Sequence, residues 1–407
     1  MISKNISKWL SNQRKKQLLT VEKIDLSKLS KWVYSKKEIY HKSKKFFKIA
    51  GVRIQSNFYN KKNWDQPIIV QNEIGILGII KNVNTNKYLL QAKVEPGNIN
   101  KIQISPTVQA TRSNYLRIHG GKTIPFLKYF KRKNRNFSLQ TEQAFRYYNK
   151  KNSNIITYVS KKIDLDEKFR WFSKIEIFNL LKEKNLINMD TLSVFSSFIK
   201  KKKIDFPLNN KKKIMKWTNS LNRKYFLNNR IISINLIKNW NLTKKKIFHK
   251  TNNYFSVIGI KVKTNKREIS DWSQPIIQGS KMAFVGYLIK KFKNTNHYLC
   301  RYILKPGSKM ATYTCSVNTS KFKGYKKNKD LTNFQKKLIS KYFINSKNVL
   351  YDNILSDEGG RFYHSQIKYM ACIMDKNQDI KLPECYIWLS QNQLIDLIHK
   401  QKIDIEA

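Results

Sequence analysis

The sequence predicts an α+β fold that is built twice in tandem, with mixed β-sheets and flanking helices. Three observations lead to this prediction. Two long stretches of the chain match one another at a nearly constant offset. Apolar residues make up 41% of the chain and aromatic residues 13%, which is enough for two packed cores. Each stretch also contains runs of β-branched and aromatic residues, followed by one amphipathic helix.

Identical residues of uncommon types carry the repeat. Each partner lies 208 positions after the first residue in the pairs Trp32/Trp240, His41/His249, Phe47/Phe255, Gly51/Gly259, Trp64/Trp272, Gln66/Gln274, Pro67/Pro275 and Gly78/Gly286. The offset grows to 210 at Pro96/Pro306, to 216 at Glu142/Glu358 and to 217 at Trp171/Trp388. Small steps of this kind are expected where loops gain a few residues. Because the repeat is too long for a solenoid unit, each copy is expected to be a domain with its own core.

The repeat divides the chain into four segments. Residues 1–23 are expected to form a basic N-terminal arm without a counterpart in the second copy, and residues 24–200 to form the first module. Residues 201–231 are interpreted as a linker rich in Lys and Asn with some helix, and residues 232–407 as the second module.

Local patterns predict the elements of each copy. Apolar residues at helical spacing predict a short helix that reaches Trp32 and another that reaches Trp240. Strands are predicted at Phe46–Ile54, Ile74–Lys81, Lys87–Val94, Ile155–Val159 and Tyr254–Val262, and a turn at Glu95–Asn98. Closing helices are predicted at Ser173–Lys184 and Ser390–Gln401, each beginning at a serine suited to N-capping.

The charge of the chain raises the alternative of nucleic-acid binding. The formal net charge is +55, from 81 basic and 26 acidic residues, and clustered basic residues gain affinity for phosphates. Only 13 of the basic residues are Arg, however, and the charge is spread along the whole chain. We therefore interpret it as a solvated basic surface without a specific nucleic-acid partner.

Cysteine usage and hydropathy indicate a compartment. The four cysteines all lie in the second half, and none forms a C-x-x-C pair, so the pattern supports neither a zinc site nor a disulfide framework. No stretch reaches about 18 consecutive apolar residues, the length of a membrane span. The sequence therefore predicts a soluble, cytoplasmic protein with reduced cysteines and no membrane association.

One segment differs from the Lys-rich remainder of the chain. Residues 105–115, with the sequence SPTVQATRSNY, carry a single charge and many neutral hydrogen-bonding groups. A ligand with several hydroxyl groups needs such partners, because an unpaired buried polar group costs about 1–3 kcal/mol. The alternative interpretation is a polar surface loop.

A set of motifs in order along the chain resembles a known family. The motifs are WDQPI (64–68), EPGN (95–98), SPTVQAT (105–111), SNY (113–115), HGG (119–121), FRW (169–171), NMD (188–190), WSQPI (272–276) and DEGGRFYH (357–364). Together they resemble the nucleoside-diphosphate-hexose 2,3-dehydratases. The resemblance implies two Nudix-like modules, a homodimer, and a substrate made of 4-keto-6-deoxyglucose on thymidine diphosphate (dTDP). It implies neither a metal nor a nicotinamide, and the R-E-x-x-E-E cluster of metal-dependent Nudix hydrolases is missing from the sequence. A Nudix-type diphosphate hydrolase is retained as an alternative.

Candidate site residues follow from the resemblance and from residue type. The catalytic candidates are His119 as the base, with Glu142 as the next candidate, and Tyr115 as a proton donor. The candidates for substrate binding are Trp64, Gln66, Glu95, Asn98, Thr107, Gln109, Arg112, Ser113, Asn114 and Arg117. Among these, the arginines suit a diphosphate, and the tryptophan suits either thymine stacking or the core. The candidates in the second module are Trp272, Gln274, Glu358, Arg361, Tyr363 and His364.

The two copies are not equivalent in their polar residues. Glu95 is matched by Lys305 and Asn98 by Ser308, and the SPTVQ segment is replaced by CSVNT at residues 315–319. The first module is therefore expected to be catalytic, and the second to be degenerate or to support nucleotide-sugar binding or dimerisation. Glu142 is expected to have its repeat partner in Glu358.

Overall fold

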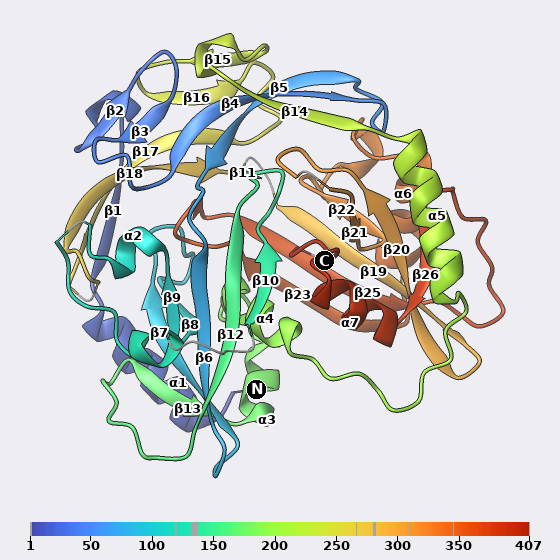
Figure 1. Ribbon diagram of the computed structural model, residues 1–407, viewed down its shortest axis with the longest axis horizontal. Coiled ribbons are helices and arrows are strands. Elements are labelled where there is room, and N and C mark those ends of the chain that lie inside the picture. Colours follow the sequence, from blue (N-terminus) through green and yellow to red (C-terminus); the bar gives the residue numbers. More distant parts are fainter. Residues whose placement is uncertain are drawn as a thin grey trace.

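In the computed structural model of the chain, each half of the sequence contributes two mixed β-sheets (Figure 1). The structure describes residues 2–118, 120–131, 137–265, 267–279, 282–308, 310–344 and 346–406. The tandem α+β architecture predicted from the sequence is confirmed. No helix in these described ranges is long and apolar enough to cross a membrane.

The first half contains the following elements. They are α1 (Lys4–Lys16), β1 (Leu19–Ile24), η1 (Leu26–Lys28), β2 (Trp32–Tyr34), β3 (Ile39–His41), β4 (Lys48–Ser56), β5 (Asn63–Val70), β6 (Gly75–Asn82), β7 (Lys87–Val94), β8 (Ile102–Pro106), β9 (Val108–Ala110), α2 (Arg112–Tyr115), η2 (Leu127–Phe130), β10 (Phe137–Thr141), β11 (Tyr147–Tyr148), β12 (Lys151–Val159), β13 (Phe169–Phe172), α3 (Lys174–Leu180) and α4 (Met189–Ser197).

The second half repeats most of this order. Its elements are α5 (Lys211–Lys224), β14 (Leu227–Ile232), η3 (Ile234–Leu236), β15 (Trp240–Leu242), β16 (Lys246–His249), β17 (Ser256–Thr264), β18 (Asp271–Gln278), β19 (Ala283–Phe292), β20 (Thr295–Ile303), β21 (Thr312–Thr314), β22 (Val317–Thr319), η4 (Tyr325–Lys327), α6 (Asn333–Leu338), η5 (Ile339–Ile344), β23 (Val349–Ser356), β24 (Phe362–Tyr363), β25 (Gln366–Ile373), β26 (Tyr386–Ser390) and α7 (Gln391–His399).

The two halves exchange their first strands. Strand β1 pairs with β17 of the second half, and β14 pairs with β4 of the first half, in the same antiparallel arrangement. The helices before them, α1 and α5, are equivalent too. The Trp9 indole of α1 donates a hydrogen bond to the Glu167 carbonyl, and the Trp217 indole of α5 donates one to the Glu384 carbonyl. Residues 1–23 thus have a counterpart in the second half, contrary to our expectation, while the domain boundaries themselves stay a prediction.

The sheets β2–β5 with β11 and β15–β18 with β24 share one hydrophobic core. This core contains Ile49 and Ile69 from the first half together with Val257 and Ile277 from the second half, all at most 1% exposed. Two guanidinium groups cross between the halves in the same way. Arg146 lies 4.2 Å from the ring centroid of Phe255, and Arg361 lies 4.1 Å from that of Phe47. The halves therefore form one packed body.

The remaining sheet of each half divides into two arms, and we call it the fork sheet. In the first half, β6 and β7 pair only near their hairpin, and beyond it β9 pairs with β6 while β8 pairs with β7. Thr107 lies at the point of division, where its hydroxyl accepts a hydrogen bond from the Ile80 amide (3.1 Å) and donates to the Leu89 carbonyl. Ser316 makes the same two bonds in the second half.

Most of the local predictions are confirmed. Strand β7 has the predicted bounds, the other predicted strands are present, and the closing helices begin at the predicted caps, Ser173 and Ser390, each in a capping box. The helices predicted to reach Trp32 and Trp240 are wrong. Each is a single 3₁₀ turn, and the tryptophan begins a strand. Buried leucine and isoleucine side chains at such spacing also suit a turn followed by a strand.

Candidate active site

Four carboxyl groups gather in the fork of the first half. Glu95 follows β7, Glu142 follows β10, Asp190 lies in the first turn of α4, and Glu358 precedes β24 of the second half. The first three are buried, with exposed fractions of 3%, 9% and 5%, whereas Glu358 is partly exposed. Glu358 is therefore the most exposed of the four carboxyl residues.

The carboxyl groups influence one another strongly. Burial and the nearby charge of Glu358 raise the pKa of Glu142 to about 7. Burial also raises the pKa of Asp190 well above its usual value, and the charges of Glu142, Glu358 and Glu95 add to this effect. The pKa of Glu358 is raised by burial and by Glu95, while Arg361 and the Tyr147 hydroxyl oppose the shift. The site can thus hold protonated and ionised carboxyl groups together near neutral pH.

A loop of the second half completes this site. The Gly97 amide donates to the Gly359 carbonyl (2.7 Å), and the His364 amide donates to the Gly97 carbonyl (2.9 Å). A Cβ atom on Gly97 would lie 1.7 Å from the Phe362 carbonyl oxygen, so the contact requires glycine. This contact brings Glu358 to Tyr147, whose hydroxyl donates to Glu358 Oε2 (2.8 Å). The predicted turn at Glu95–Asn98 therefore joins the halves.

Glu95 lies in a network of charged and amide groups. Lys93 Nζ is 3.3 Å from Glu95 Oε1 and 2.9 Å from Gln109 Oε1, and the Gln109 amide nitrogen is 3.4 Å from Glu95 Oε1. Arg267, on the loop between β17 and β18, lies 3.8 Å from Glu95 Oε1 and donates to the Val94 carbonyl (2.9 Å). Gln109 and Glu95 were predicted site residues, and the structure brings them together.

Several buried polar atoms around these groups have no hydrogen-bond partner among the residues that the structure describes. They are Glu95 Oε2, Asn98 Oδ1, Gln103 Nε2, Ser105 Oγ and Arg361 Nε. Each such atom costs about 1–3 kcal/mol unless something pairs with it. Their donors and acceptors match the inventory that a polyhydroxylated ligand requires.

The equivalent position in the second half is neutralised internally. Lys305 takes the place of Glu95, and its ammonium group contacts Asp404 and, at 3.1 Å, Glu406. Asn318 donates to the same Glu406 carboxylate (3.1 Å). Burial alone would lower the pKa of Lys305, but the two carboxylates raise it above its usual value. The charge of Lys305 is thus balanced by carboxylates of the same chain, and its ammonium group has hydrogen-bond partners.

The strand pairing corrects two of the expected repeat partners. Gln109 faces Leu77 and Asn318 faces Val285, so the partner of Gln109 is Asn318 and not Thr319. The Glu142 amide donates to the Lys150 carbonyl, as the Asp357 amide does to that of Ser365. Glu142 is therefore equivalent to Asp357, and the partner of Glu358 is Gln143. The alignment by residue identity was wrong by one position at both places.

Each half contributes a Trp–Gln pair, Trp64/Gln66 or Trp272/Gln274, and in the structure each pair lies at the site of the other half. Gln274 donates a hydrogen bond to the Gly360 carbonyl (2.8 Å). The Trp272 indole donates a hydrogen bond to the Gln274 side-chain oxygen (2.9 Å). Arg267, which contacts Glu95, lies 5.9 Å from the Trp272 ring centroid. The second-half pair thus belongs to the first-half site.

Trp64 and Gln66 lie instead at the second-half site. Gln66 donates to the Phe145 carbonyl (2.8 Å), and Lys305 lies 5.2 Å from the Phe145 ring centroid. Trp64 packs edge-on against Tyr59, with 5.3 Å between the ring centroids, and the Tyr59 hydroxyl contacts the Leu304 carbonyl. These two predicted substrate residues are therefore separated from Glu95.

The other predicted residues have varied surroundings. Tyr115 packs against the apolar cluster that includes Phe130, and Lys131 Nζ lies 5.5 Å from its ring centroid. The Ser113 amide donates to Glu73 (2.6 Å). Three of the remaining positions, Arg112, Asn114 and Arg117, lie on α2 or just after it, where the two arginines are exposed and the asparagine is partly buried. His119 lies outside the described residues.

Tyr363 and His364 form a stacked pair beside the loop that carries Glu358. Their ring centroids are 4.1 Å apart, and Lys23 Nζ lies 4.9 Å from the Tyr363 ring. Burial and the charge of Lys23 lower the pKa of His364. Both residues were predicted for the second module, and the structure places them at the junction with the Glu95–Asn98 turn.

Sequence reasoning missed four residues of the site. Asp190 lay within the quoted NMD motif and could have been selected as its carboxylate. Lys93 and Gln103 alternate with apolar residues on strands, which is also the pattern of an exposed strand face. Arg267 lies on a loop of the other half, so no local signal connects it with Glu95.

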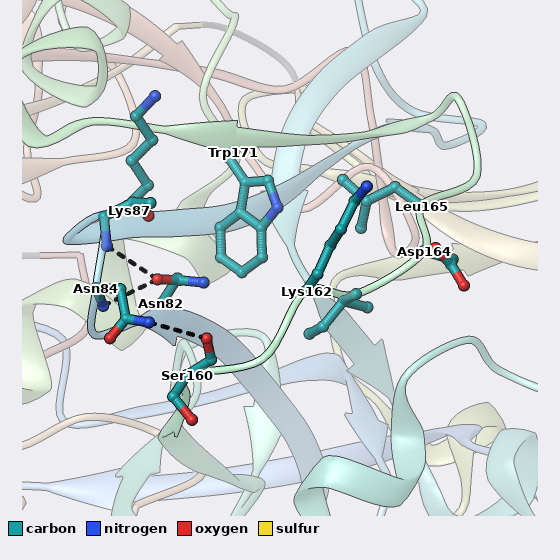
Figure 2. Close-up of a pocket in the computed structure, with 10 residues that line it drawn as sticks. Asn82, Asn84, Lys87, Ser160, Lys162, Asp164, Leu165 and Trp171 are labelled. Carbon is teal, nitrogen blue, oxygen red and sulfur yellow. Dashed lines mark hydrogen bonds between the residues drawn. The ribbon is translucent and has the colours of Figure 1, made fainter.

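A separate hollow of about 620 Å³ lies at the far end of the first fork sheet (Figure 2). It is lined by Asn82, Asn84, Thr85, Lys87, Ser160, Lys162, Ile163, Asp164, Leu165 and Trp171. The Asn84 side chain donates to the Ser160 carbonyl (3.1 Å). None of the four site carboxyl groups lines this hollow. In the described part of the chain, no group of three or more His, Cys, Asp or Glu side chains could hold a metal ion.

Comparison with known proteins yields a family model and named relatives. A model described as NDP-hexose 2,3-dehydratase matches the chain twice, at residues 3–198 and 211–406. A dTDP-4-dehydro-6-deoxy-alpha-D-glucopyranose 2,3-dehydratase of Streptomyces violaceoruber is 30% identical, over 88% of this chain and 84% of its own. Proteins of the same name from Saccharopolyspora spinosa and Amycolatopsis orientalis are each 28% identical, covering 96% and 100% of this chain and 86% and 89% of their own.

A solved structure is also similar over part of the chain. The structure titled "Crystal Structure of C. elegans Ap4A Hydrolase" covers 29% of this chain and 85% of its own, at 14% sequence identity and a TM-score of 0.20. A TM-score this low does not establish a shared fold, so the Nudix-like character of each module stays a prediction.

Proposed function

Because the chain belongs to the family of NDP-hexose 2,3-dehydratases, we propose that it removes water from carbons 2 and 3 of a dTDP-linked 4-keto-6-deoxyglucose. The product is a 2-deoxy-3,4-diketo sugar nucleotide, an intermediate of deoxysugar biosynthesis. The names of the relatives indicate the substrate, and the site described above supplies the residues that would act on it.

The reaction can proceed by acid–base chemistry alone. The C4 ketone acidifies the C3 hydrogen, so a base can remove it while negative charge moves onto the C4 oxygen. The C2 hydroxyl, which is β to the ketone, then leaves as water after receiving a proton from an acid. The resulting enol tautomerises to the diketone, and one water is lost in total. A positioned base and acid contribute about 10²–10⁴-fold to such proton transfers.

We assign the base to Glu358 and the acid to Glu142. Arg361 and the Tyr147 hydroxyl both favour the ionised form of Glu358. Burial and the Glu358 charge favour the protonated form of Glu142, whose pKa is raised to about 7. The pKa values of both groups are raised, and the charge of Glu358 disfavours ionisation of Glu142, so one carboxyl group can hold a proton while the other is ionised. His119 remains the alternative base.

The remaining polar groups suit binding of the sugar and its nucleotide. Gln109, Asn98 and Glu95 present amide and carboxylate groups to the fork, and Asn98 Oδ1 and Glu95 Oε2 have no partner among the described residues. Arg267 offers a guanidinium group that can pair with a diphosphate, and the neighbouring Trp272 offers an aromatic face for thymine. We place the substrate in the first-half site for these reasons.

The observation that supports the proposal best is the set of buried polar atoms around the carboxyl groups that have no partner in the described part of the chain. The test is incubation of the purified protein with dTDP-4-keto-6-deoxyglucose in D₂O, followed by mass spectrometry and NMR. We expect loss of one water and deuterium exchange at C3. Binding of the sugar nucleotide with neither change would refute the proposed activity.

We further propose a cytoplasmic homodimer that has no specific nucleic-acid partner. The proposal of a dimer rests on the family resemblance, and that of the compartment rests on the cysteine pattern and hydropathy of the sequence. Sedimentation equilibrium of the purified protein measures the first, and fractionation of cells measures the second.

A further inference from the structure

The hollow of Figure 2 has a filled counterpart in the second half. Three of its lining residues, Thr85, Lys87 and Trp171, correspond to Thr295, His297 and Trp388. In the second half, the chain between α4 and α5 runs across Thr295, His297 and Trp388 and then along α7 (Figure 1). We call residues 201–209 of this connection the strap.

Three hydrogen bonds join the strap to strands β20 and β26. The Phe206 amide donates to Thr295 Oγ1 (3.1 Å), and the Leu208 amide donates to His297 Nε2 (2.9 Å). The Asn209 side chain donates to the Trp388 carbonyl (2.9 Å). The groove therefore binds an extended backbone.

Side chains of α7 and its cap hold the same segment. Ser390 donates to the Asp205 carboxylate (2.6 Å), and Asn392 exchanges two bonds with the Lys202 backbone, of 2.8 and 2.9 Å. Lys201 pairs with Asp396 at 2.5 Å. The contacts thus continue along the helix from its cap to its middle.

The first half keeps the groove but shows no such segment in the described residues. Thr85, Trp171 and Ser173 are identical to their second-half counterparts, so the same donors and acceptors are available. On α3, Ile175 and Phe178 are 73% and 53% exposed, whereas Ile395, the counterpart of Phe178, is 2% exposed. An apolar helix face and the hollow therefore lie open side by side.

The charge of the groove selects its occupant. Lys87 replaces His297, so the position that accepts a hydrogen bond in the second half can only donate one in the first. Lys162 and Asp164 line the same hollow, so its charged lining residues are two lysines and one aspartate, and positive charge is in excess. A Lys-rich segment like the strap would be repelled there, whereas acidic side chains and main-chain carbonyls would be attracted.

We propose that the hollow and the adjoining face of α3 form a docking groove for an extended acidic segment of a partner protein. The segment binds with its backbone along Thr85 and Trp171, places a carboxylate near Lys87, and covers Ile175 and Phe178 with apolar side chains. This is the binding mode of the strap, transferred to the groove that the chain leaves open.

The test uses a synthetic peptide as the probe. A fluorescent peptide EEEIDFPLNN, which is residues 201–210 with the three lysines replaced by glutamates, is titrated against the full-length protein and followed by anisotropy. We expect saturable binding, at least about tenfold tighter than that of KKKIDFPLNN. The absence of saturation up to about 1 mM peptide, or tighter binding of the Lys-rich peptide, would overturn the proposal.

Matched variants locate the binding. Thr85→Val combined with Lys87→Glu should weaken binding about tenfold without changing the melting temperature, while Thr295→Val in the second-half groove should leave it unchanged. A photo-cross-linker at the phenylalanine of the peptide should label residues of the Figure 2 hollow. Labelling near His297 would show that the peptide displaces the strap, and would contradict the proposed groove.

Discussion

The fork sites of the two halves have the same backbone and opposite electrostatic character. In the first half, Glu95 contacts Lys93 and Arg267 and lies among other carboxyl groups, and its Oε2 atom has no hydrogen-bond partner among the described residues. In the second half, Lys305 at the same place is paired with Asp404 and Glu406. A buried polar atom without a hydrogen-bond partner costs stability, so its retention is consistent with use, whereas a fully paired charge can be structural. The comparison supports the proposal that the substrate binds in the first-half site.

The largest expected effect is on the proposed base. Glu358→Gln gives the first site the residue type of its counterpart, Gln143, and removes the ionisable group. We expect turnover to fall by about 10²–10⁴-fold and deuterium exchange at C3 to stop, with the sugar nucleotide still bound. Glu142→Gln should instead abolish water loss while exchange continues. The reverse pattern would exchange the roles of base and acid.

Lys305→Met should separate stability from activity. The change leaves Asp404 and Glu406 buried without their ammonium partner, so we expect a loss of about 3–5 kcal/mol in the free energy of unfolding, measured by denaturant titration. The matched change Glu95→Gln should cost less stability and more turnover. If Lys305→Met lowered turnover in protein that remained fully folded, the second site would have a direct role in the reaction.

Gln109 and Asn318 provide a matched pair of smaller changes. Gln109→Ala removes the amide between Lys93 and Glu95, and we expect turnover to fall about tenfold at an unchanged melting temperature. Asn318→Ala, at the equivalent place, should leave turnover unchanged. Steady-state kinetics of the two variants give the comparison, and equal losses would mean that both forks contribute to catalysis.

Arg267 and Tyr59 test the loops that reach across the halves. Arg267 donates to the Val94 carbonyl, and Tyr59 makes the same contact with the equivalent carbonyl, that of Leu304. If Arg267 binds the diphosphate, Arg267→Met should raise KM several-fold, with Arg267→Lys restoring part of the affinity. Tyr59→Phe should change neither kcat nor KM. A loss confined to kcat would instead indicate that Arg267 positions Glu95.

The smallest expected effect is on the pH dependence of stability. Glu142 has a pKa of about 7 in the folded chain, above the value of about 4.3 for an unfolded one. Folding therefore favours its protonated form, and this contribution is complete below about pH 4 and is lost as the pH rises through 7. The melting temperature should fall more between pH 5 and pH 8 in the unaltered protein than in Glu142→Gln. Parallel curves would show that Glu142 ionises normally.

Local patterns in the sequence predicted the elements, and the repeat predicted their duplication. Strand β7 and the caps at Ser173 and Ser390 depend on neighbouring residues only, so short windows of sequence contain the necessary information. The positions of Trp32 and Trp240 were misjudged because one turn of apolar spacing does not distinguish a helix from a 3₁₀ turn before a strand.

The composition of the site could be predicted only in part. Glu95, Gln109 and Glu358 were selected from motifs, and Glu142 from its residue type and its repeat match. They were divided between two modules because each was assigned to the half that encodes it. The contact between Gly97 and Gly359 joins residues far apart in sequence, and no local pattern reports it. The same limitation explains why Trp64 was grouped with Glu95, and why Arg267 was missed.

The exchanged first strands have a consequence for how the chain folds during synthesis. Leu19 at the start of β1 pairs with Thr264, so the partner of the first strand to be made is translated only after the whole first half. Contacts with such large sequence separation slow folding, because the loop between them must be ordered first. During synthesis, β1 therefore stays unpaired until β17 has been made. In this period its free edge could associate with strands of other chains. The many lysines along the chain would oppose that association by mutual repulsion.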